Sequence, residues 1–267
     1  MSTLIEFDGV CKYYQMGDTL VKATDHVSFK INKGEFVAIV GQSGSGKSTC
    51  MNIIGCLDVP TEGTYLLDGK DVGKMSRREL AHIRNEKLGF IFQLPNLYPW
   101  LTVRENLILP LKVYKMADEE HIRYVDELLD TIGLANCADI YPGEISGGMA
   151  QRIGVIRGMV HKPQMLMMDE PFGALDDDMR ERLNIEMLNI WKKTGMTIIF
   201  ITHNVSEAVL LSQRIYVMQS HPGTVKAMIP IEFEEERTLD LLRTPKFNAY
   251  CEQIENLIGK IDLNDVV

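Results

Sequence analysis

The stretch GQSGSGKST at residues 41–49 constrains the fold more than any other part of the chain. It fits G-x-x-x-x-G-K-[ST], follows the apolar run FVAIV, and opens a segment that favours a helix. Glycines let successive backbone amides turn toward phosphates, Lys47 reaches the terminal phosphates, and Ser48 offers its hydroxyl to magnesium. The predicted nucleotide-binding residues of this loop are Gly41, Ser43, Gly44, Ser45, Gly46, Lys47, Ser48 and Thr49.

An acidic pair follows a second apolar run. In the segment QMLMMDEP, four apolar residues are followed directly by Asp169 and Glu170. Such a pair at a strand end is often only a helix cap or a solvated turn. Beside a phosphate-binding loop, however, Asp169 is expected to orient magnesium and Glu170 to polarise the attacking water.

Two further polar side chains follow apolar runs that read as strands. His203 comes directly after TIIFIT, and Gln93 directly after LGFIF. Ligands of parallel sheets sit at the carboxyl ends of the strands. His203 is therefore a candidate donor to a γ-phosphate and Gln93 a candidate ligand of magnesium and water, against the alternatives of a packed or surface histidine and an edge-strand glutamine.

A second glycine segment, EISGGMAQR at residues 144–152, also opens a predicted helix, because Met149, Ile153, Ile156 and Val160 recur at helical spacing. The backbone amides at such a helix start favour an anion. This segment lacks the lysine of the first loop. The residues alone do not explain why one chain carries both segments.

Composition excludes several classes of protein. The 267 residues carry 28 basic and 37 acidic side chains, a net charge of −9, without a basic stripe, so no nucleic acid is expected as a partner. The start MSTLIEFDGV lacks the pattern of a signal peptide, and no apolar run is long enough to span a membrane. The five cysteines form no CxxC pair, which suits reduced thiols in the core better than disulfides or a zinc site.

The order of predicted elements indicates an α/β fold. Short strands dominate to about residue 72, mainly helical segments follow to about 160, and apolar strands then alternate with helices. We predict a P-loop NTPase core of the RecA-like kind with a mainly parallel sheet, an antiparallel β subdomain and an inserted α-helical subdomain at about 95–160. The domain with this core should occupy residues 1–230, and residues 231–267 should form a short acidic tail with one helix after Pro245.

Seven motifs occur in the order found in ATP-binding subunits of ABC transporters, and the resemblance covers about residues 3–225. They are Tyr14, GQSGSGKST, FQ at 92–93, ISGGMAQR, MLMMDEP, GALD at 173–176 and ITH at 201–203. The resemblance implies that Tyr14 stacks on adenine, that the first loop holds the triphosphate, and that Gln93 and Asp169 attend Mg²⁺. Glu170, His203, Gln93 and Lys47 are the catalytic candidates.

The same resemblance accounts for the second glycine segment. It implies that Ser146, Gly147, Gly148 and Met149 cover ATP bound to a second ATP-binding subunit in a head-to-tail dimer, which supplies the missing lysine. Asp176 would connect the two sites across the interface. Ile145 and Met149 replace the leucine and glutamine that are usual in this motif, and we expect ATP hydrolysis to survive because the serine and the glycine amides remain.

The two halves of the chain resemble different branches of the family. NIIGCLDVPTEG at 52–63 resembles lipoprotein-release and macrolide-efflux ATPases, whereas YPWLTVRENL, DEPFGALD and THNVSEAVLLSQRIYVMQSHPG resemble importer ATPases for nitrate, sulfonate and taurine. The second set is longer and favours an importer subunit, with transmembrane permease subunits and indirectly a solute-binding protein as partners. An exporter ATPase and a soluble ABC ATPase remain the alternatives. The expected location is peripheral, on the cytoplasmic face of the inner membrane.

The segment LPNLYPWL at 94–101 is unusually apolar for a loop. One interpretation is that it anchors the helical subdomain. The other is that it receives a cytoplasmic helix of a permease.

Overall fold

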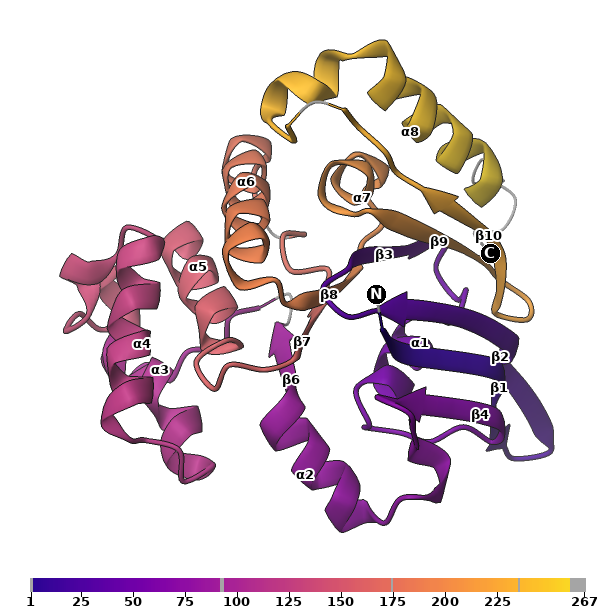
Figure 1. Cartoon of the computed structure of the whole chain (residues 1–267), viewed down its shortest axis with the longest axis horizontal. Helices are drawn as coiled ribbons and strands as arrows, with labels where there is room; N and C mark the ends of the chain where they lie inside the picture. The colour runs from indigo at the N-terminus through magenta and orange to yellow at the C-terminus, as the bar shows by residue number, and fades with distance from the viewer. Residues whose placement is uncertain (1, 92–93, 174, 235, 260–267) are drawn as a thin grey trace. The chain divides into compact units, whose positions relative to one another are not determined.

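The computed structural model describes residues 2–91, 94–173, 175–234 and 236–259, so the candidate residue Gln93 lies outside the described part. The chain forms two compact units, the first made of residues 1–80 and 197–267 and the second of residues 81–196 (Figure 1). Each unit is described separately below.

The first unit contains an antiparallel sheet in the order β2-β1-β4-β5 (Figure 1). Along β2, buried Val27, Phe29 and Ile31 alternate with exposed Ser28 and Lys30, the period-two pattern of a strand with one face in the core. The antiparallel β subdomain predicted from the sequence is thereby confirmed. Its strands are β1 (Thr3–Met16), β2 (Thr19–Asn32), β4 (Glu62–Leu67) and β5 (Lys70–Asp71).

The first unit also contains parallel strands. β3 pairs in parallel with β8 and with β9, and β10 pairs antiparallel with β9. All residues of β3 and β8 are buried, which is typical of parallel strands that are covered on both faces. These strands are β3 (Phe36–Gly41), β8 (Thr197–Ile201), β9 (Arg214–Gln219) and β10 (Thr224–Pro230).

Helices pack on these strands. α1 contacts β3, α7 packs on β3, and α8 packs on α7 and β9 (Figure 1). The helix predicted after Pro245 is confirmed as α8, whose first turn is capped by Thr244 and whose Phe247 and Ile254 are buried. The helical segments of this unit are α1 (Lys47–Ile54), η1 (Val72–Lys74), α7 (Val205–Leu211), η4 (Leu239–Arg243) and α8 (Pro245–Ile258); α2 (Arg77–Lys87) continues into the second unit.

The second unit is mainly helical and contains one parallel strand pair. β6 (Leu88–Ile91) pairs with β7 (Met165–Asp169), whose first four residues are buried. α3 packs against α4 and α5, and α4 also contacts α5. The helices are α3 (Val103–Val113), α4 (Glu119–Thr131), η2 (Ala135–Cys137), η3 (Pro142–Glu144), α5 (Gly147–Arg157) and α6 (Asp177–Thr194).

Among the described residues, no helix combines the length and the apolar character needed to cross a bilayer. The expectation that all cysteines are core residues is wrong for two of them. Cys11, Cys50 and Cys56 are buried free thiols, whereas Cys137 and Cys251 are partly exposed. Cys251 lies on α8 beside the buried face formed by Phe247 and Ile254, so helical periodicity leaves it at the edge of the core, whereas Cys137 ends the short helix η2, which has no buried residue.

Candidate functional site

The phosphate-binding loop connects the end of β3 to α1, as the sequence predicts. Gly44 and Gly46 have φ of 76° and 84°, the left-handed region that favours glycine. A Cβ on Gly46 would stand 2.6 Å from the carbonyl oxygen of Ala23, so that position also lacks space for a side chain. Ser43 and Gly44 are exposed whereas Ser45 is buried, which leaves the outer rim of the loop open to a ligand.

Lys47 is held by the loop itself. Its ammonium donates to the carbonyl oxygens of Gly41 at 2.8 Å and of Gln42 at 2.7 Å, and lies 3.5 Å from Ser45 Oγ. A lysine held over a loop of outward-turned amides places a positive charge where a phosphate chain would lie. The next residue, Ser48, is exposed in the first turn of α1.

His203 belongs to the same unit as the loop, and the strand register explains its position. Ile39 of β3 pairs with Ile201 of β8, so the two parallel strands end at the same edge. His203 is exposed in the turn that follows, between buried Thr202 and Asn204, the N-cap of α7. Thr202 accepts the amide of Asn204 at 3.0 Å and donates to Glu207 at 2.7 Å, which fixes the turn.

Tyr14 on β1 lies beside the helix that follows the loop. Its hydroxyl donates to Asp58 at 3.0 Å and also interacts with Thr49. Burial and the hydrogen bond to Asp58 raise the pKa of the Tyr14 hydroxyl to about 12. Tyr14 is 36% exposed and lies near the loop, and the ammonium of Lys12 lies 5.2 Å from the centroid of its ring.

The acidic pair stands at the end of β7 in the second unit. Asp169 is the last strand residue, and Glu170 has φ of 46°, a left-handed backbone that is uncommon for a side chain of this size. Backbone strain of this kind occurs preferentially at functional positions. The strand, rather than a helix cap, sets the position of both carboxylates, because α6 begins only at Asp177.

The glycine segment at 145–149 opens α5, as predicted. Ser146 is its N-cap and accepts the amide of Met149 at 3.3 Å. Ser146 and Gly147 are exposed, whereas Gly148 is buried against Met179, whose Cε would stand 2.5 Å from a Cβ at Gly148. The exposed helix start is suited to an anion.

Asp176 lies close to this segment within the second unit. It is the N-cap of α6 and accepts the amide of Met179 at 2.9 Å. Gly148 and Asp176 therefore approach the same methionine from two helices. The side chain of buried Gln151 on α5 also donates to the carbonyl of Pro171, directly after the acidic pair.

Sequence reasoning missed two residues that fix the apolar loop at 94–101. Buried Asn106 on α3 accepts the amide of Tyr98 at 2.7 Å and donates to the carbonyl oxygens of Tyr98, Leu101 and Thr102. Arg157 at the end of α5 donates to the carbonyl oxygens of two other loop residues, Pro95 and Asn96. No spacing in the sequence marks either contact.

The same loop exposes apolar surface. Leu94, Tyr98 and Trp100 are 60%, 44% and 68% exposed, and the Tyr98 and Trp100 rings lie 5.4 Å apart. Leu97 is half-buried. A rigidly held loop with exposed aromatic side chains is typical of a contact surface for another protein.

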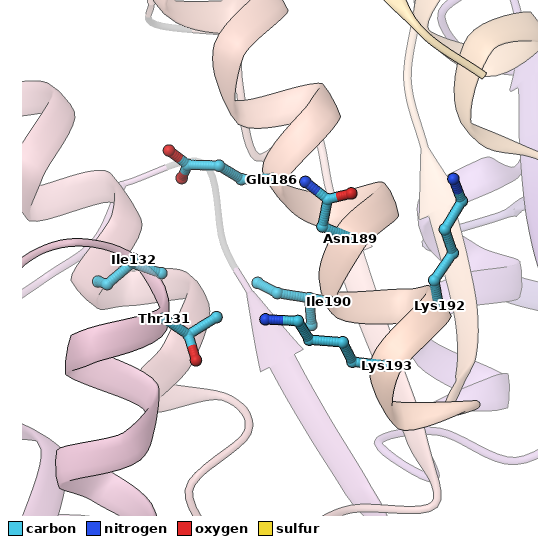
Figure 2. A pocket seen from close by; sticks show the side chains of 7 residues that line it. All are labelled: Thr131, Ile132, Glu186, Asn189, Ile190, Lys192 and Lys193. Atoms are coloured by element: carbon cyan, nitrogen blue, oxygen red, sulfur yellow. The ribbon is translucent and has the colours of Figure 1, made fainter. Parts of the chain in front are cut away.

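A cavity of about 310 Å³ in the second unit contains none of the predicted site residues (Figure 2). It lies between the end of α4 and α6, where burial raises the pKa of Glu186 and the nearby Arg152 opposes that shift. Its lining residues are Thr131, Ile132, Glu186, Asn189, Ile190, Lys192 and Lys193.

The loop residues fit the phosphates of a nucleotide. Positive φ at Gly44 and Gly46 and the crowded Cβ positions of Gly41 and Gly46 form a backbone cradle that side chains would fill. Lys47 supplies the charge and Ser48 an exposed hydroxyl.

A strand, a phosphate-binding loop and a helix, with the acidic pair at the end of a second buried strand, define a P-loop ATPase. The family model described as "ABC transporter" matches residues 24–173. The chain belongs to that family, as its ATP-binding component, which confirms the resemblance and the fold class predicted from the sequence.

The relatives are named for the import or export of different solutes. The nitrate import ATP-binding protein NrtD of Synechocystis sp. is 40% identical over 245 residues, covering 89% of this chain and 88% of that protein. An aliphatic sulfonates import ATP-binding protein of Bacillus cereus is 38% identical, covering 84% and 85%. The macrolide export protein MacB of Neisseria gonorrhoeae is 42% identical over 202 residues, covering 76% of this chain but 31% of that protein.

A solved structure of an ATP-binding cassette has the same fold. It is a dimer in a post-hydrolysis state bound to ADP and Pi, 35% identical, with a TM-score of 0.75. The alignment covers 86% of this chain and 100% of that one. It supports the prediction of an ATP-hydrolysing cassette that pairs with a second copy or a related subunit.

Proposed function

We propose that this chain is the ATP-hydrolysing motor of a membrane importer for a small anionic solute of the nitrate or sulfonate class. Support comes from relatives named for nitrate and sulfonate import, whose alignments span most of both chains. The observation that carries the transport role is the loop at 94–101, which is apolar, exposed and fixed at its backbone by Asn106 and Arg157.

For hydrolysis, we assign the first unit to nucleotide binding. The loop amides and Lys47 bind the phosphates, Tyr14 stacks on the adenine, and His203 donates to the γ-phosphate. Ser48 would hold Mg²⁺ together with Asp169 and Gln93, and the ion would neutralise charge on the phosphates. Glu170 accepts the proton of the attacking water.

In the proposed dimer, the exposed start of α5 covers the nucleotide of the other subunit. Ser146, Gly147, Gly148 and Met149 present amides and a hydroxyl to that phosphate chain. We assign Asp176 to the connection between the two nucleotide sites. Asp176 accepts the amide of Met179, and the side chain of Met179 packs against Gly148. Closure of the dimer on ATP and its release after hydrolysis drive the permease.

α5 provides a physical link between ATP and the permease. Its first residues form the nucleotide-facing segment, and Arg157 at its last position holds the loop at 94–101. Gly154 lies between these ends, and a Cβ there would stand 3.0 Å from Pro95 Cβ, so the helix packs directly on the loop. Movement of the helix start is therefore expected to move the apolar loop.

The proposal is tested by isolating the tagged chain from gently solubilised membranes of its native host and identifying the proteins that accompany it. A multi-spanning permease with an associated solute-binding protein is the expected result. A four-helix membrane subunit with a large extracytoplasmic domain would instead support the export alternative that the MacB match favours. Recovery with no membrane protein would contradict the transport role.

Charge on the apolar loop should strongly weaken membrane association. In a Tyr98→Glu, Trp100→Glu double variant, two exposed aromatic side chains become acidic while the contacts of Asn106 and Arg157 with the loop backbone remain. We expect at least a tenfold loss of co-purified permease, since burial of two unpaired charges costs more than about 1.4 kcal/mol. ATP hydrolysis by the purified chain should stay unchanged.

The matched control is Val113→Glu, which charges a 66% exposed apolar residue at the end of α3, outside the loop. It should leave membrane association intact. If the double variant remains on membranes as the control does, the permease surface lies elsewhere.

A further inference from the structure

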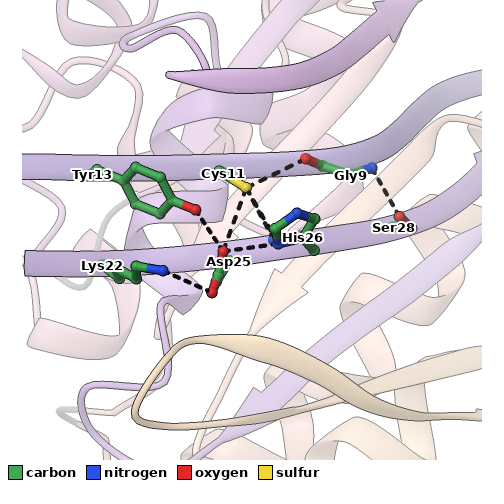
Figure 3. A network of polar contacts seen from close by, with 7 residues as sticks. All are labelled: Gly9, Cys11, Tyr13, Lys22, Asp25, His26 and Ser28. Atoms are coloured by element: carbon green, nitrogen blue, oxygen red, sulfur yellow. Dashed lines mark hydrogen bonds and ion pairs between the residues drawn. The ribbon is translucent and has the colours of Figure 1, made fainter.

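We propose that Cys11, Asp25 and His26 form a zinc-binding site on the antiparallel sheet, separate from the nucleotide chemistry. The three side chains come from the facing strands β1 and β2 and converge on one point (Figure 3). The three side chains are all of types that bind metal ions, and their donor atoms all lie within 4.8 Å of one another.

A bulge in the sheet brings the three side chains together. Val10 pairs with Val27 but Lys12 pairs with Thr24, so β2 carries one residue more than β1 over this step. The extra residue is accommodated at His26, whose backbone is left-handed with φ of 51°. Consecutive residues of a regular strand point to opposite faces, and a bulge of this kind re-aims one side chain, which lets Asp25 and His26 both reach Cys11.

The donor spacing fits a tetrahedral ion. Cys11 Sγ lies 3.6 Å from Asp25 Oδ1 and 3.8 Å from His26 Nδ1, and the last two atoms are 2.9 Å apart. Zinc bonds of about 2.3 Å to sulfur and about 2.0–2.1 Å to nitrogen and oxygen at tetrahedral angles put these donors roughly 3.3–3.6 Å apart. Small movements therefore suffice to bind the ion.

The surroundings of the three donors resemble the outer shell of a metal site. The Tyr13 hydroxyl donates to Asp25 Oδ1 at 2.6 Å, and Lys22 Nζ lies 3.5 Å from Asp25 Oδ2 (Figure 3). The amide of His26 donates to Cys11 Sγ at 3.2 Å. Such hydrogen bonds orient metal ligands and tune their basicity.

Exposure leaves a path for the ion. Cys11 is fully buried and the Asp25 side chain is 17% exposed, whereas the His26 side chain is 76% exposed. The ion would thus have a protected sulfur on one side and solvent on the other, with a water as fourth ligand. Binding displaces the thiol proton of Cys11 to solvent and leaves the His26 proton on Nε2.

The donor set selects the cation. Thiolate and imidazole are poor ligands for Mg²⁺ and Ca²⁺, which prefer oxygen, and suit zinc. The site also adjoins the phosphate-binding loop, since Gly46 of that loop packs against Ala23 and Thr24 of β2. The bound ion would therefore fix the strand on which the loop rests.

Cobalt titration of the chelator-treated, nucleotide-free full chain tests the site, because a Co²⁺–thiolate bond gives a charge-transfer band that Mg²⁺-type sites lack. We expect one equivalent of Co²⁺ to produce this band and Zn²⁺ to remove it. Cys11→Ser should abolish the band. His26→Asn should weaken Co²⁺ binding by at least about tenfold, the loss typical of even an outer-shell partner.

The variants are chosen to preserve the fold. Asparagine tolerates the left-handed backbone at position 26, and that side chain is exposed, so His26→Asn remains informative even if Cys11→Ser does not fold. Two variants outside the site are the controls. Cys251→Ser removes a partly exposed thiol, and His121→Asn removes an imidazole whose Nδ1 lies 2.8 Å from Asp118 Oδ1. Both should keep the band; its absence in the parent chain, or its persistence in Cys11→Ser, would overturn the proposal.

Discussion

Replacing Glu170 by Gln is expected to lower kcat for ATP hydrolysis by at least about a hundredfold, the lower limit for removal of a general base. Glutamine keeps the size of the side chain and removes the carboxylate that we propose as the acceptor of the proton of water. The backbone strain at φ of 46° is common to both residues, so the fold should not change. ATP binding is retained, and a nucleotide-bound dimer accumulates.

Phosphate release and light scattering on a sizing column measure the two effects. Glu127→Gln, which neutralises an exposed carboxylate on α4, is the matched control and should hydrolyse ATP at the parent rate. A Glu170→Gln chain that stays monomeric with saturating Mg-ATP would falsify the proposed mechanism.

Replacing Gly46 by Ala is expected to destabilise the first unit by more than about 3 kcal/mol and to abolish ATP binding. The left-handed backbone alone costs a side chain about 1–3 kcal/mol, and the new Cβ would also stand 2.6 Å from the Ala23 carbonyl oxygen. The loop must move to relieve this contact. Denaturant unfolding without nucleotide and nucleotide binding measure the two losses.

Gly44→Ala separates backbone strain from crowding. Gly44 has φ of 76°, close to that of Gly46, but a Cβ there meets no atom within 4 Å. Its cost should be the strain contribution alone, about 1–3 kcal/mol. Equal stability of the two variants would show that the contact with Ala23 does not restrict the loop.

The sequence predicted the parts of the molecule that follow from local patterns. Apolar runs ending in glycine or an acid identified β3 and β7, and the Gly-Lys-Ser order identified the loop. The glycine segment at 145–149 opens α5 as its apolar spacing indicates. In each case one chain segment contains the whole signal, so neighbours in the sequence are sufficient.

Contacts between distant segments could not be predicted in this way. The argument from cysteine spacing disfavoured a zinc site, because it considered only cysteines close in sequence. Cys11 meets Asp25 and His26 through strand pairing and a bulge. Arg157 donates to carbonyl oxygens about 60 positions away in the sequence. Every residue type carries a backbone carbonyl, so the sequence does not indicate which residues accept these hydrogen bonds.

The contacts of α5 with the apolar loop also have a consequence for redesign of this surface. Arg157 and Gly154 contact the loop backbone and Pro95, and Asn106 hydrogen-bonds three polar backbone groups of the loop and the carbonyl oxygen of Thr102, which follows it. A different loop sequence introduced alone would face Gly154 and Arg157 of α5, which fit the present loop backbone. The loop, α3 and α5 are therefore joined by these contacts, and if the loop binds a permease as we propose, fitting it to a different permease should require matching changes in both helices.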